Sequence, residues 1–324
     1  MVEYVGPQRS SGHQSHGGVN TMLERFLIPL DTSEVAERVL AWAIPLAKRL
    51  GQPVVLLSVI RDHDDLGPAA GRHRPALSSL MEQRRTGVQG YLNEVQARLA
   101  TEGITATTEV ATGAVAESII AAAASHQSGL IAMATHGRVG PERWFLGSVA
   151  DRVVRTSAVP VLLVRPGEGQ VAAPMDIRQI LLPLDGSALA EDVLPAAVTL
   201  AKALGVPIKL VRTLSLTWIL AGSSPYGVES YATPEIINDL EDEAKSYLEQ
   251  TAEELRTNDV VVDTAFALRE PAPEITDLAV ATPGTLVVMH SHGRSGLQRS
   301  LLGSVTDAVI RSSAAPVLVI RGAL

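Results

Sequence analysis

The chain carries one pattern twice. RFLIPLDTSEVAERVL, starting at Arg25, aligns with QILLPLDGSALAEDVL, starting at Gln179, which places Asp31 opposite Asp185 at an offset of 154 residues. Towards the end of each copy, ATHGRVGPERWFLGS from Ala134 aligns with HSHGRSGLQRSLLGS from His290 at an offset of 156 residues. A register that shifts so little over this distance indicates two duplicated domains and not a solenoid of short repeats.

The length agrees with this division, because 324 residues provide two domains of roughly 150 residues each. We predict a disordered leader at 1–22, a first domain at 23–166, a linker at 167–177 and a second domain at 178–324. The leader is rich in Gly, Ser and His and has no apolar signal region, and Met22 is an alternative start. The linker is short, so we expect the two domains to stay in contact.

Each copy alternates apolar, β-rich runs with helical patterns. In the first copy, FLIPL and VVLLSVI are expected strands on either side of a helix that begins near Ser33, a candidate N-cap. Its apolar stripe is Val39, Ala43, Leu46 and Leu50, which matches Val193, Ala197, Leu200 and Leu204. Alternating buried strands and helices predict two tandem doubly wound α/β domains, each with a parallel sheet covered on both faces.

Some segments interrupt the pattern. Residues 61–86 and 215–239 differ between the copies and carry Gly, Pro and polar residues, so we expect variable loops or lids there. Pro45 and Pro195 either kink their helices or mark a late helix start.

The composition excludes several classes of function. Aromatic residues make up only 3% of the chain and its formal net charge is -8 without a run of Lys or Arg, which argues against nucleic-acid and anionic-membrane partners. The absence of cysteine excludes disulfides and thiolate metal sites. No apolar run approaches the roughly 18 residues of a membrane span, so we expect a cytoplasmic protein. Small molecules and other proteins are the partners left.

The string that begins at Ala134 has the features of an anion site. It follows a strand and enters a helix at Gly147, so free backbone N–H groups and the positive end of a helix dipole meet there. Gly137 and Gly147 allow close backbone approach, and the Ser148 hydroxyl adds a donor. The alternative is that Gly137 only forms a turn and Ser148 only caps the helix. The same nine-residue spacing in both copies favours a functional role.

Together these strings resemble the universal stress protein family in tandem form. LIPLD and LLPLDGS, His-Gly-Arg, Leu-Gly-Ser-Val and the closing P-V-L strands carry the resemblance over nearly the whole chain. It implies a five-stranded parallel sheet in each domain, packed as a pseudo-dimer through the final strands, 161–165 and 317–321. It also implies ATP binding through G-x2-G-x9-G-[ST], with ribose and phosphates held by the glycine amides and the hydroxyl.

The resemblance assigns nucleotide-binding residues in both copies. In the first copy they are Asp31 and the backbone of Val59 for adenine, then Ala134, Gly137, Gly147, Ser148 and Val149 for ribose and phosphates. In the second copy they are Asp185, Thr213, His290, Gly293, Gly303, Ser304 and Val305. Both copies depart from the motif at its first glycine, which is Ala134 or His290, and Glu270 stands opposite Gly113. We therefore expect the first site to be more intact than the second.

Other polar residues have ordinary explanations. We interpret Arg138 and Arg294 as surface charges more readily than as phosphate ligands, and His136 and His292 as loop residues. The acidic cluster at 62–65 is interpreted as a solvated charge run, so we expect no bound metal apart from Mg²⁺ that arrives with nucleotide.

These expectations leave three functions open. The first is an ATP-binding stress-response regulator whose binding to an unknown protein partner depends on the nucleotide. The second is a nucleotide-free interaction protein, and the third a weak ATPase. We expect no catalytic residues, because the sequence has no P-loop, nucleophile elbow or H-E-x-x-H motif. Further association into a homodimer is left open.

Overall fold

The computed structural model describes residues 24–61, 74–135, 146–165, 175–215, 233–291 and 302–321, without the side chains of 74–78. The predicted leader lies outside these residues. We call 24–165 the first half and 175–321 the second half. The first half contains, in chain order, β1 (Phe26–Pro29), α2 (Glu34–Glu37), α3 (Leu40–Leu50), β2 (Val54–Ile60), α4 (Arg74–Thr101), β3 (Ala106–Thr112), α5 (Val115–Ser125), β4 (Leu130–Ala134), α6 (Ser148–Thr156) and β5 (Val161–Val164).

The second half repeats this order. Its elements are β6 (Gln179–Pro183), α7 (Ala188–Glu191), α8 (Leu194–Leu204), β7 (Ile208–Thr213), α10 (Pro234–Arg256), β8 (Val262–Ala267), α11 (Pro271–Ala281), β9 (Thr285–His290), α12 (Ser304–Ser312) and β10 (Val317–Ile320). The predicted alternation of strands and helices is confirmed in both halves.

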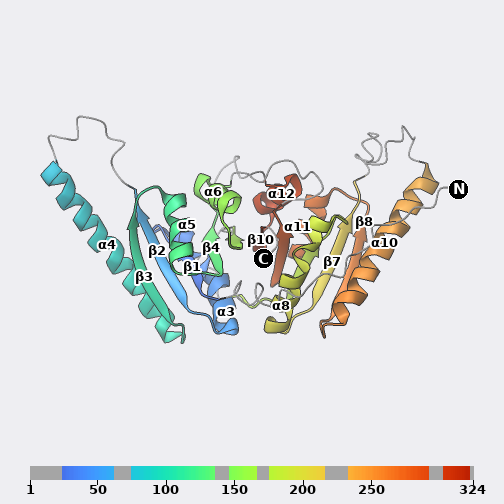
Figure 1. Ribbon diagram of the computed structural model, residues 1–324, viewed down its shortest axis with the longest axis horizontal. Coiled ribbons are helices and arrows are strands. Elements are labelled where there is room, and N and C mark those ends of the chain that lie inside the picture. Colours follow the sequence, from blue (N-terminus) through green and yellow to red (C-terminus); the bar gives the residue numbers. More distant parts are fainter. Residues whose placement is uncertain are drawn as a thin grey trace.

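All of these strands form one 10-stranded sheet with the order β3-β2-β1-β4-β5-β10-β9-β6-β7-β8 (Figure 1). Neighbouring strands within each half are parallel. The halves join where β5 and β10 pair antiparallel, with Leu162 opposite Leu318. The expected pairing of the two final strands is therefore confirmed, and the tandem chain is an intramolecular pseudo-dimer.

Helices cover both faces of this sheet, and each face has its own hydrophobic core. Alternate residues of a strand point to opposite faces, so Ile28 and Leu56 pack towards α3 and α4, and Leu27 and Leu57 pack towards α5 and α6. The second half repeats this with α8 and α10 on one face and α11 and α12 on the other. Figure 1 shows α6 beside α12 near the middle of the molecule, and α3 beside α8 below them.

The helix after β1 confirms the predicted stripe and shows the effect of its proline. Val39, Ala43 and Leu46 are buried, and Ser33 caps the preceding turn by accepting a hydrogen bond from the Ala36 N–H. Pro45 lies inside α3, and because it has no N–H, the carbonyl of Ala41 has no helical donor. The Met175 N–H, at the start of the second half, donates to that carbonyl at 2.9 Å. Pro195 instead occupies the first turn of α8, where proline is tolerated.

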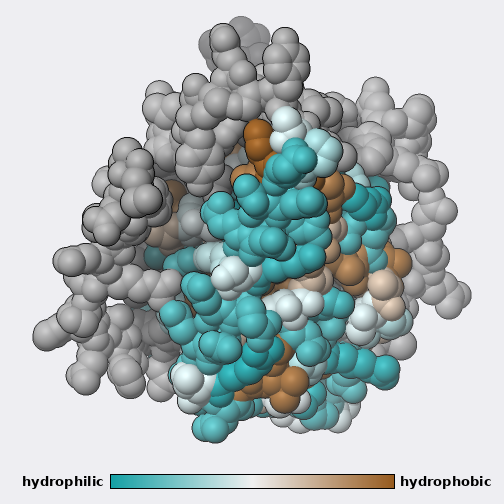
Figure 2. Space-filling view, turned by 90° about the vertical axis from the view of Figure 1, so that its right-hand side faces the viewer, coloured by the Kyte–Doolittle hydropathy of each residue, from teal (hydrophilic) through white to brown (hydrophobic). Residues whose placement is uncertain are grey.

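The prediction of loops at 61–86 and 215–239 was wrong at their C-terminal ends. α4 already begins at Arg74, and α10 begins at Pro234 behind the capping Thr233. Residues 82–86 are exposed although helical, so this part of α4 has no apolar stripe from which a helix could be recognised. Figure 2 views the molecule from the side of α10 and shows a mainly hydrophilic surface with small, separate hydrophobic groups.

Candidate functional site

The candidate sites lie where the order of the strands reverses. In the first half the chain passes from β1 outward to β2 and β3 and then returns to β4 on the other side of β1. Open α/β sheets bind ligands at such a switch point, beyond the carboxyl ends of the strands. β1 and β4 bring Asp31 and Ala134 to this edge, and β6 and β9 bring Asp185 and His290 to the matching edge of the second half.

Asp31 follows β1 in a turn that fixes its carboxylate. One carboxylate oxygen accepts hydrogen bonds from the Ser33 backbone N–H at 3.1 Å and from the Ser33 hydroxyl at 2.5 Å. Asp185 accepts the same two bonds from Ser187, at 2.9 and 2.6 Å. Asp31 is exposed and Asp185 is partly buried. The duplicated sequence therefore places a carboxylate in the same local turn twice.

The backbone of Val59 lies past the last hydrogen bond between β1 and β2. Leu30 donates to the Leu57 carbonyl at 2.8 Å, and backbone groups alternate sides along a strand, so Val59 presents the next groups on the β1 side. The neighbouring Ile60 faces β3 instead, where it accepts from Gly113 at 3.0 Å. β1 has ended at this level, so the N–H and C=O of Val59 point towards the switch point.

Thr213 has the same place in the second half. Leu184 donates to the Val211 carbonyl at 2.8 Å, which makes Thr213 the next position on the β6 side. Leu214 donates to Ala267 of β8 at 3.0 Å and so faces the opposite edge. Both halves thus present one strand backbone beside the predicted acidic residue.

Two helix N-termini complete the sites. α6 and α12 begin directly after Gly147 and Gly303, and neither cap residue makes a side-chain hydrogen bond to its helix. Ser148 and Ser304 are the first helical residues and are exposed, while Val149 and Val305 pack against the core. Uncapped first-turn N–H groups, a hydroxyl and the helix dipole favour an anion. The alternative that Ser148 caps α6 is wrong, because Gly147 occupies the cap position.

The last residues of β4 and β9 differ in size but are equally buried. Ala134 and His290 stand in place of the first motif glycine, and each is 7% exposed. The Thr306 hydroxyl of α12 donates to the His290 carbonyl at 2.9 Å, whereas the equivalent of Thr306 in the first half is Ala150. The second half therefore has an imidazole and an additional helix-to-strand hydrogen bond where the first half has methyl groups.

Further polar contacts cross the edge of the second half. The Ser215 hydroxyl donates to Glu270, and the Gly303 N–H donates to the Ser291 carbonyl at 2.6 Å. Glu270 is the cap residue of α11, and the cap residue of α5 in the first half is Ala114, so the predicted alignment of Glu270 with Gly113 is wrong by one residue. In the second half, hydrogen bonds between the protein's own groups therefore lie on both sides of the switch point.

A buried cation distinguishes β7 of the second half from β2 of the first. The Arg212 guanidinium carbon lies 4.8 Å from the ring centroid of Tyr247, and the side chain is 7% exposed. Gly186, with a φ of 80°, makes room for it, since a Cβ there would lie 3.2 Å from the Arg212 Nη2. The first half has Ser58 and Thr32 instead, and Thr32 keeps a left-handed φ of 70°. A β-branched residue in this conformation is strained by about 1–2 kcal/mol.

Each half has a partly buried tyrosine that was not predicted from the sequence, and the two tyrosines differ in their hydrogen bonds. The Tyr247 hydroxyl donates to Glu191 at 2.9 Å. The Tyr91 hydroxyl is buried without a hydrogen-bond partner among the described residues, and burial is the main cause that raises its pKa, to which Glu37 adds. Both pairs were visible as duplicates, because Glu37 and Glu191 differ by 154 residues and Tyr91 and Tyr247 by 156.

The remaining predicted residues lie outside the described part of the chain. They are Gly137 and Gly293, with His136, Arg138, His292, Arg294 and the acidic cluster at 62–65. Within the residues that are described, no group of three or more His, Asp or Glu side chains is arranged to hold a metal ion. The described helices also include none that is long and apolar enough to cross a membrane.

Comparison with known proteins identifies the family to which this arrangement belongs. The model of the universal stress protein family matches residues 22–165 and, a second time, residues 176–321. The chain belongs to the universal stress protein family. A universal stress protein of Mycolicibacterium smegmatis is 28% identical over 306 residues, which cover 91% of this chain and 96% of the relative.

Single-domain relatives match one half of this universal stress protein. Universal stress protein YxiE of Bacillus subtilis is 34% identical over 151 residues, which are 44% of this chain and 98% of the relative. Among solved structures, a universal stress protein from Archaeoglobus fulgidus covers 94% of this chain and 98% of its own, with a TM-score of 0.66 and 22% identity. That likeness shows the fold, with two repeated α/β domains, over the length of the chain.

Proposed function

We propose that this universal stress protein binds an adenine nucleotide, ATP, in its first half and acts as a regulator in the stress response. One observation carries the proposal. The Asp31 turn, the strand backbone at Val59 and the uncapped start of α6 surround the same topological switch point. A cytoplasmic location is part of this proposal.

Each of these three features suits one part of the ligand. The carboxylate of Asp31 accepts hydrogen bonds from an amino group, and the backbone at Val59 supplies one donor and one acceptor for the edge of a base. The α6 N-terminus, with Ser148, favours phosphate oxygens. Mg²⁺ that arrives with the nucleotide would take most of its ligands from the phosphates and water. The combination fits a ligand with a base at one end and an anionic tail at the other.

Binding is proposed here in preference to turnover. The sequence has no G-x4-G-K-[ST] motif, and a nucleotide hydrolase also needs a base placed at the phosphate end. Asp31 lies at the proposed base end, so it is badly placed for that task. ATP occupancy would instead order the edge of the first half and change the surface that a protein partner meets. Slow hydrolysis is the weaker alternative.

A second candidate function is a nucleotide-free assembly protein. The contacts within the second half favour it, because Glu270, Ser215 and Gly303 already have partners from the protein itself. The extensive β5–β10 junction provides a scaffold that needs no ligand.

Mass spectrometry of small molecules released from the denatured protein separates the two candidates. The proposal expects adenine nucleotide in the released fraction and a melting temperature that rises with added ATP, because only the folded state binds it. Asp31→Ala and Gly137→Val should each reduce both effects. Unchanged melting at saturating ATP, together with no nucleotide released from the wild type, would favour the assembly protein.

A further inference from the structure

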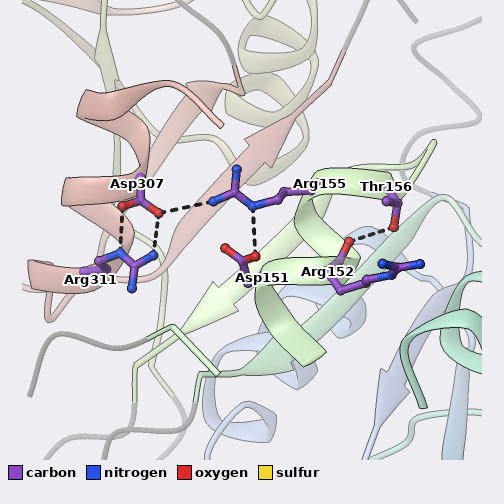
Figure 3. A network of polar contacts seen from close by, with 6 residues as sticks. All are labelled: Asp151, Arg152, Arg155, Thr156, Asp307 and Arg311. Atoms are coloured by element: carbon purple, nitrogen blue, oxygen red, sulfur yellow. Dashed lines mark hydrogen bonds and ion pairs between the residues drawn. The ribbon is translucent and has the colours of Figure 1, made fainter. Parts of the chain in front are cut away.

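Four charged residues link α6 and α12 across the junction of the halves. We call Asp151, Arg155, Asp307 and Arg311 the junction row (Figure 3). Arg155 Nε donates to Asp151 at 2.9 Å, and its Nη2 lies 3.9 Å from the Asp307 carboxylate. Arg311 donates to both oxygens of Asp307, at 2.7 and 2.8 Å. Arg155 therefore contacts both helices.

The row begins one turn from each proposed phosphate site. The N–H of Asp151 donates to the Gly147 carbonyl at 2.9 Å, and that of Asp307 donates to the Gly303 carbonyl at 2.8 Å. Both carboxylates thus lie in the first turn of their helices, where the helix dipole favours negative charge. A phosphate bound at the same helix end would repel Asp151 unless a cation neutralises that carboxylate.

Arg155 is the cation placed to do this, and its two contacts are unequal. The bond to Asp151 is a hydrogen bond, whereas the 3.9 Å approach to Asp307 is a looser ion pair between side chains that are each 27% exposed. The hydrogen bond to Asp151 is the main cause that raises the pKa of Arg155, and the charge of Asp307 adds to it. Asp307 keeps Arg311 when Arg155 moves, so the contact between halves can weaken without leaving a carboxylate unpaired.

We propose that Arg155 is a positioning residue that couples phosphate binding at the start of α6 to the contact between α6 and α12. The proposal rests on the proposed function. A polyanion at Gly147 draws Arg155 towards Asp151 and loosens its hold on Asp307. Coupling is reciprocal. Removing the charge of Asp307 should therefore free Arg155 to interact with Asp151 and the phosphate, and so tighten nucleotide binding.

A double-mutant cycle measured by titration calorimetry with MgATP tests this route. Exposed and partly exposed ion pairs contribute little, so we expect Arg155→Gln to weaken binding about threefold to tenfold and Asp307→Asn to tighten it about twofold to threefold. In the Arg155→Gln background, Asp307→Asn should have no effect. An equal effect of Asp307→Asn in both backgrounds would show simple charge removal and overturn the proposal.

Arg152→Gln is the matched control. Arg152 lies on the same helix, loses the same charge and pairs with Glu117 of α5 at 2.8 Å, away from the junction. It is nearer to Gly147 in sequence than Arg155, so a general effect of charge would make it at least as harmful. We expect less than a twofold change in affinity; a loss equal to that of Arg155→Gln contradicts the specific role of Arg155.

Hydrogen exchange of the nucleotide-free protein separates failure of this inference from failure of the proposed function. Arg155→Gln should speed exchange of α12 amides at least about twofold, and Arg152→Gln should not. Unchanged α12 exchange overturns the contact on which the inference depends, whatever the protein binds. If Arg155→Gln speeds α12 exchange as expected but the wild type binds no MgATP, the proposed function fails, and the coupling to phosphate fails with it.

Discussion

The two halves share one backbone plan but differ in what lies at the carboxyl edge of the sheet. The first half has small residues at the positions where the second half has polar ones. The exchanged pairs are Ser58 and Arg212, Ala114 and Glu270, Ala134 and His290, and Ala150 and Thr306. The acidic turns and the uncapped helix starts are common to both.

The difference shows how the polar groups of a duplicated site can find hydrogen-bond partners within the protein itself. Buried polar groups need hydrogen-bond partners, and in the second half they find them in one another. Thr306 donates to the His290 carbonyl, Ser215 to Glu270, and the Gly303 N–H to Ser291. Among the described residues, the first half has smaller side chains at these positions, which is why we propose the first half as the site of the external anion. We therefore expect the two halves to respond differently to matched changes.

The largest expected effect is on stability at the residue after the acidic one. Gly186→Thr places a Cβ 3.2 Å from Arg212 Nη2 at a left-handed φ, so we expect a loss of about 2–3 kcal/mol in the free energy of unfolding. Thr32→Gly relieves the strain of its φ of 70° and should change the free energy by no more than about 1 kcal/mol, in the stabilising direction. Urea denaturation of both variants measures the contrast.

Arg212→Ser in the Gly186→Thr background controls for the cause. If the Arg212 guanidinium is the obstacle, this second change should recover part of the stability lost. A Gly186→Thr variant as stable as the wild type would show that the two turns are interchangeable and would remove this part of the comparison.

The next effect concerns the two acidic residues. Asp31→Ala should weaken ATP binding about tenfold to a hundredfold, because a hydrogen bond to a charged group contributes about 1.5–3 kcal/mol. Asp185→Ala should change it less than twofold. Both variants lose the same bonds to Ser33 or Ser187, so similar melting temperatures of the ligand-free proteins serve as the internal control. Equal losses of affinity would contradict the assignment of the site to the first half.

A smaller effect should come from opening the second half. Glu270→Gly removes the carboxylate that Ser215 contacts, and with His290→Ala it should allow a second, weaker ATP to bind, about tenfold below the first in affinity. Glu274→Gln is the control, since it removes a carboxylate in the first turn of α11, the helix that Glu270 caps, and Glu274 pairs with Arg269. A second ATP that binds in the control, or none in the opened variant, argues against closure by Glu270.

The smallest expected effect is a loss of stability at alkaline pH, and it should be the same in both halves. Burial, with Glu37 or Glu191, raises the pKa of Tyr91 and Tyr247 above the ordinary 10.0. Their neutral forms therefore stabilise the fold below about pH 10, and this contribution is lost as the pH rises through the folded pKa, by up to about 1.4 kcal/mol per pH unit for each tyrosine. Tyr91→Phe and Tyr247→Phe should reduce the alkaline loss equally in denaturation at about pH 9 to 11. Unequal effects would extend the difference between the halves to these pairs.

Much of the fold could be predicted from the sequence because its signals are local and repeated. Buried strands, the Ser33 cap and the stripe from Val39 depend on neighbouring residues, and duplication separates them from chance. The pairing of β5 with β10 was expected from family resemblance alone. The extent of α4 could not be predicted, because its exposed residues 82–86 lack the apolar period that identifies a helix.

The contrast between the sites depends on contacts that no local pattern specifies. The sequence identified His290 and Glu270 as departures, but not that Thr306 and Ser215 donate to them or that Arg212 packs against Gly186. These contacts join residues on different elements. The left-handed φ of Thr32 could not be predicted from the sequence either, because threonine rarely adopts that conformation.

The most direct measurement for the account is the stoichiometry of ATP binding by titration calorimetry of the intact chain and of its Asp31→Ala and Asp185→Ala variants. We predict one ATP per chain, bound about tenfold to a hundredfold more weakly by Asp31→Ala and with less than about a twofold change in affinity by Asp185→Ala. Two equivalent sites, or a single site that survives Asp31→Ala and disappears in Asp185→Ala, would contradict it.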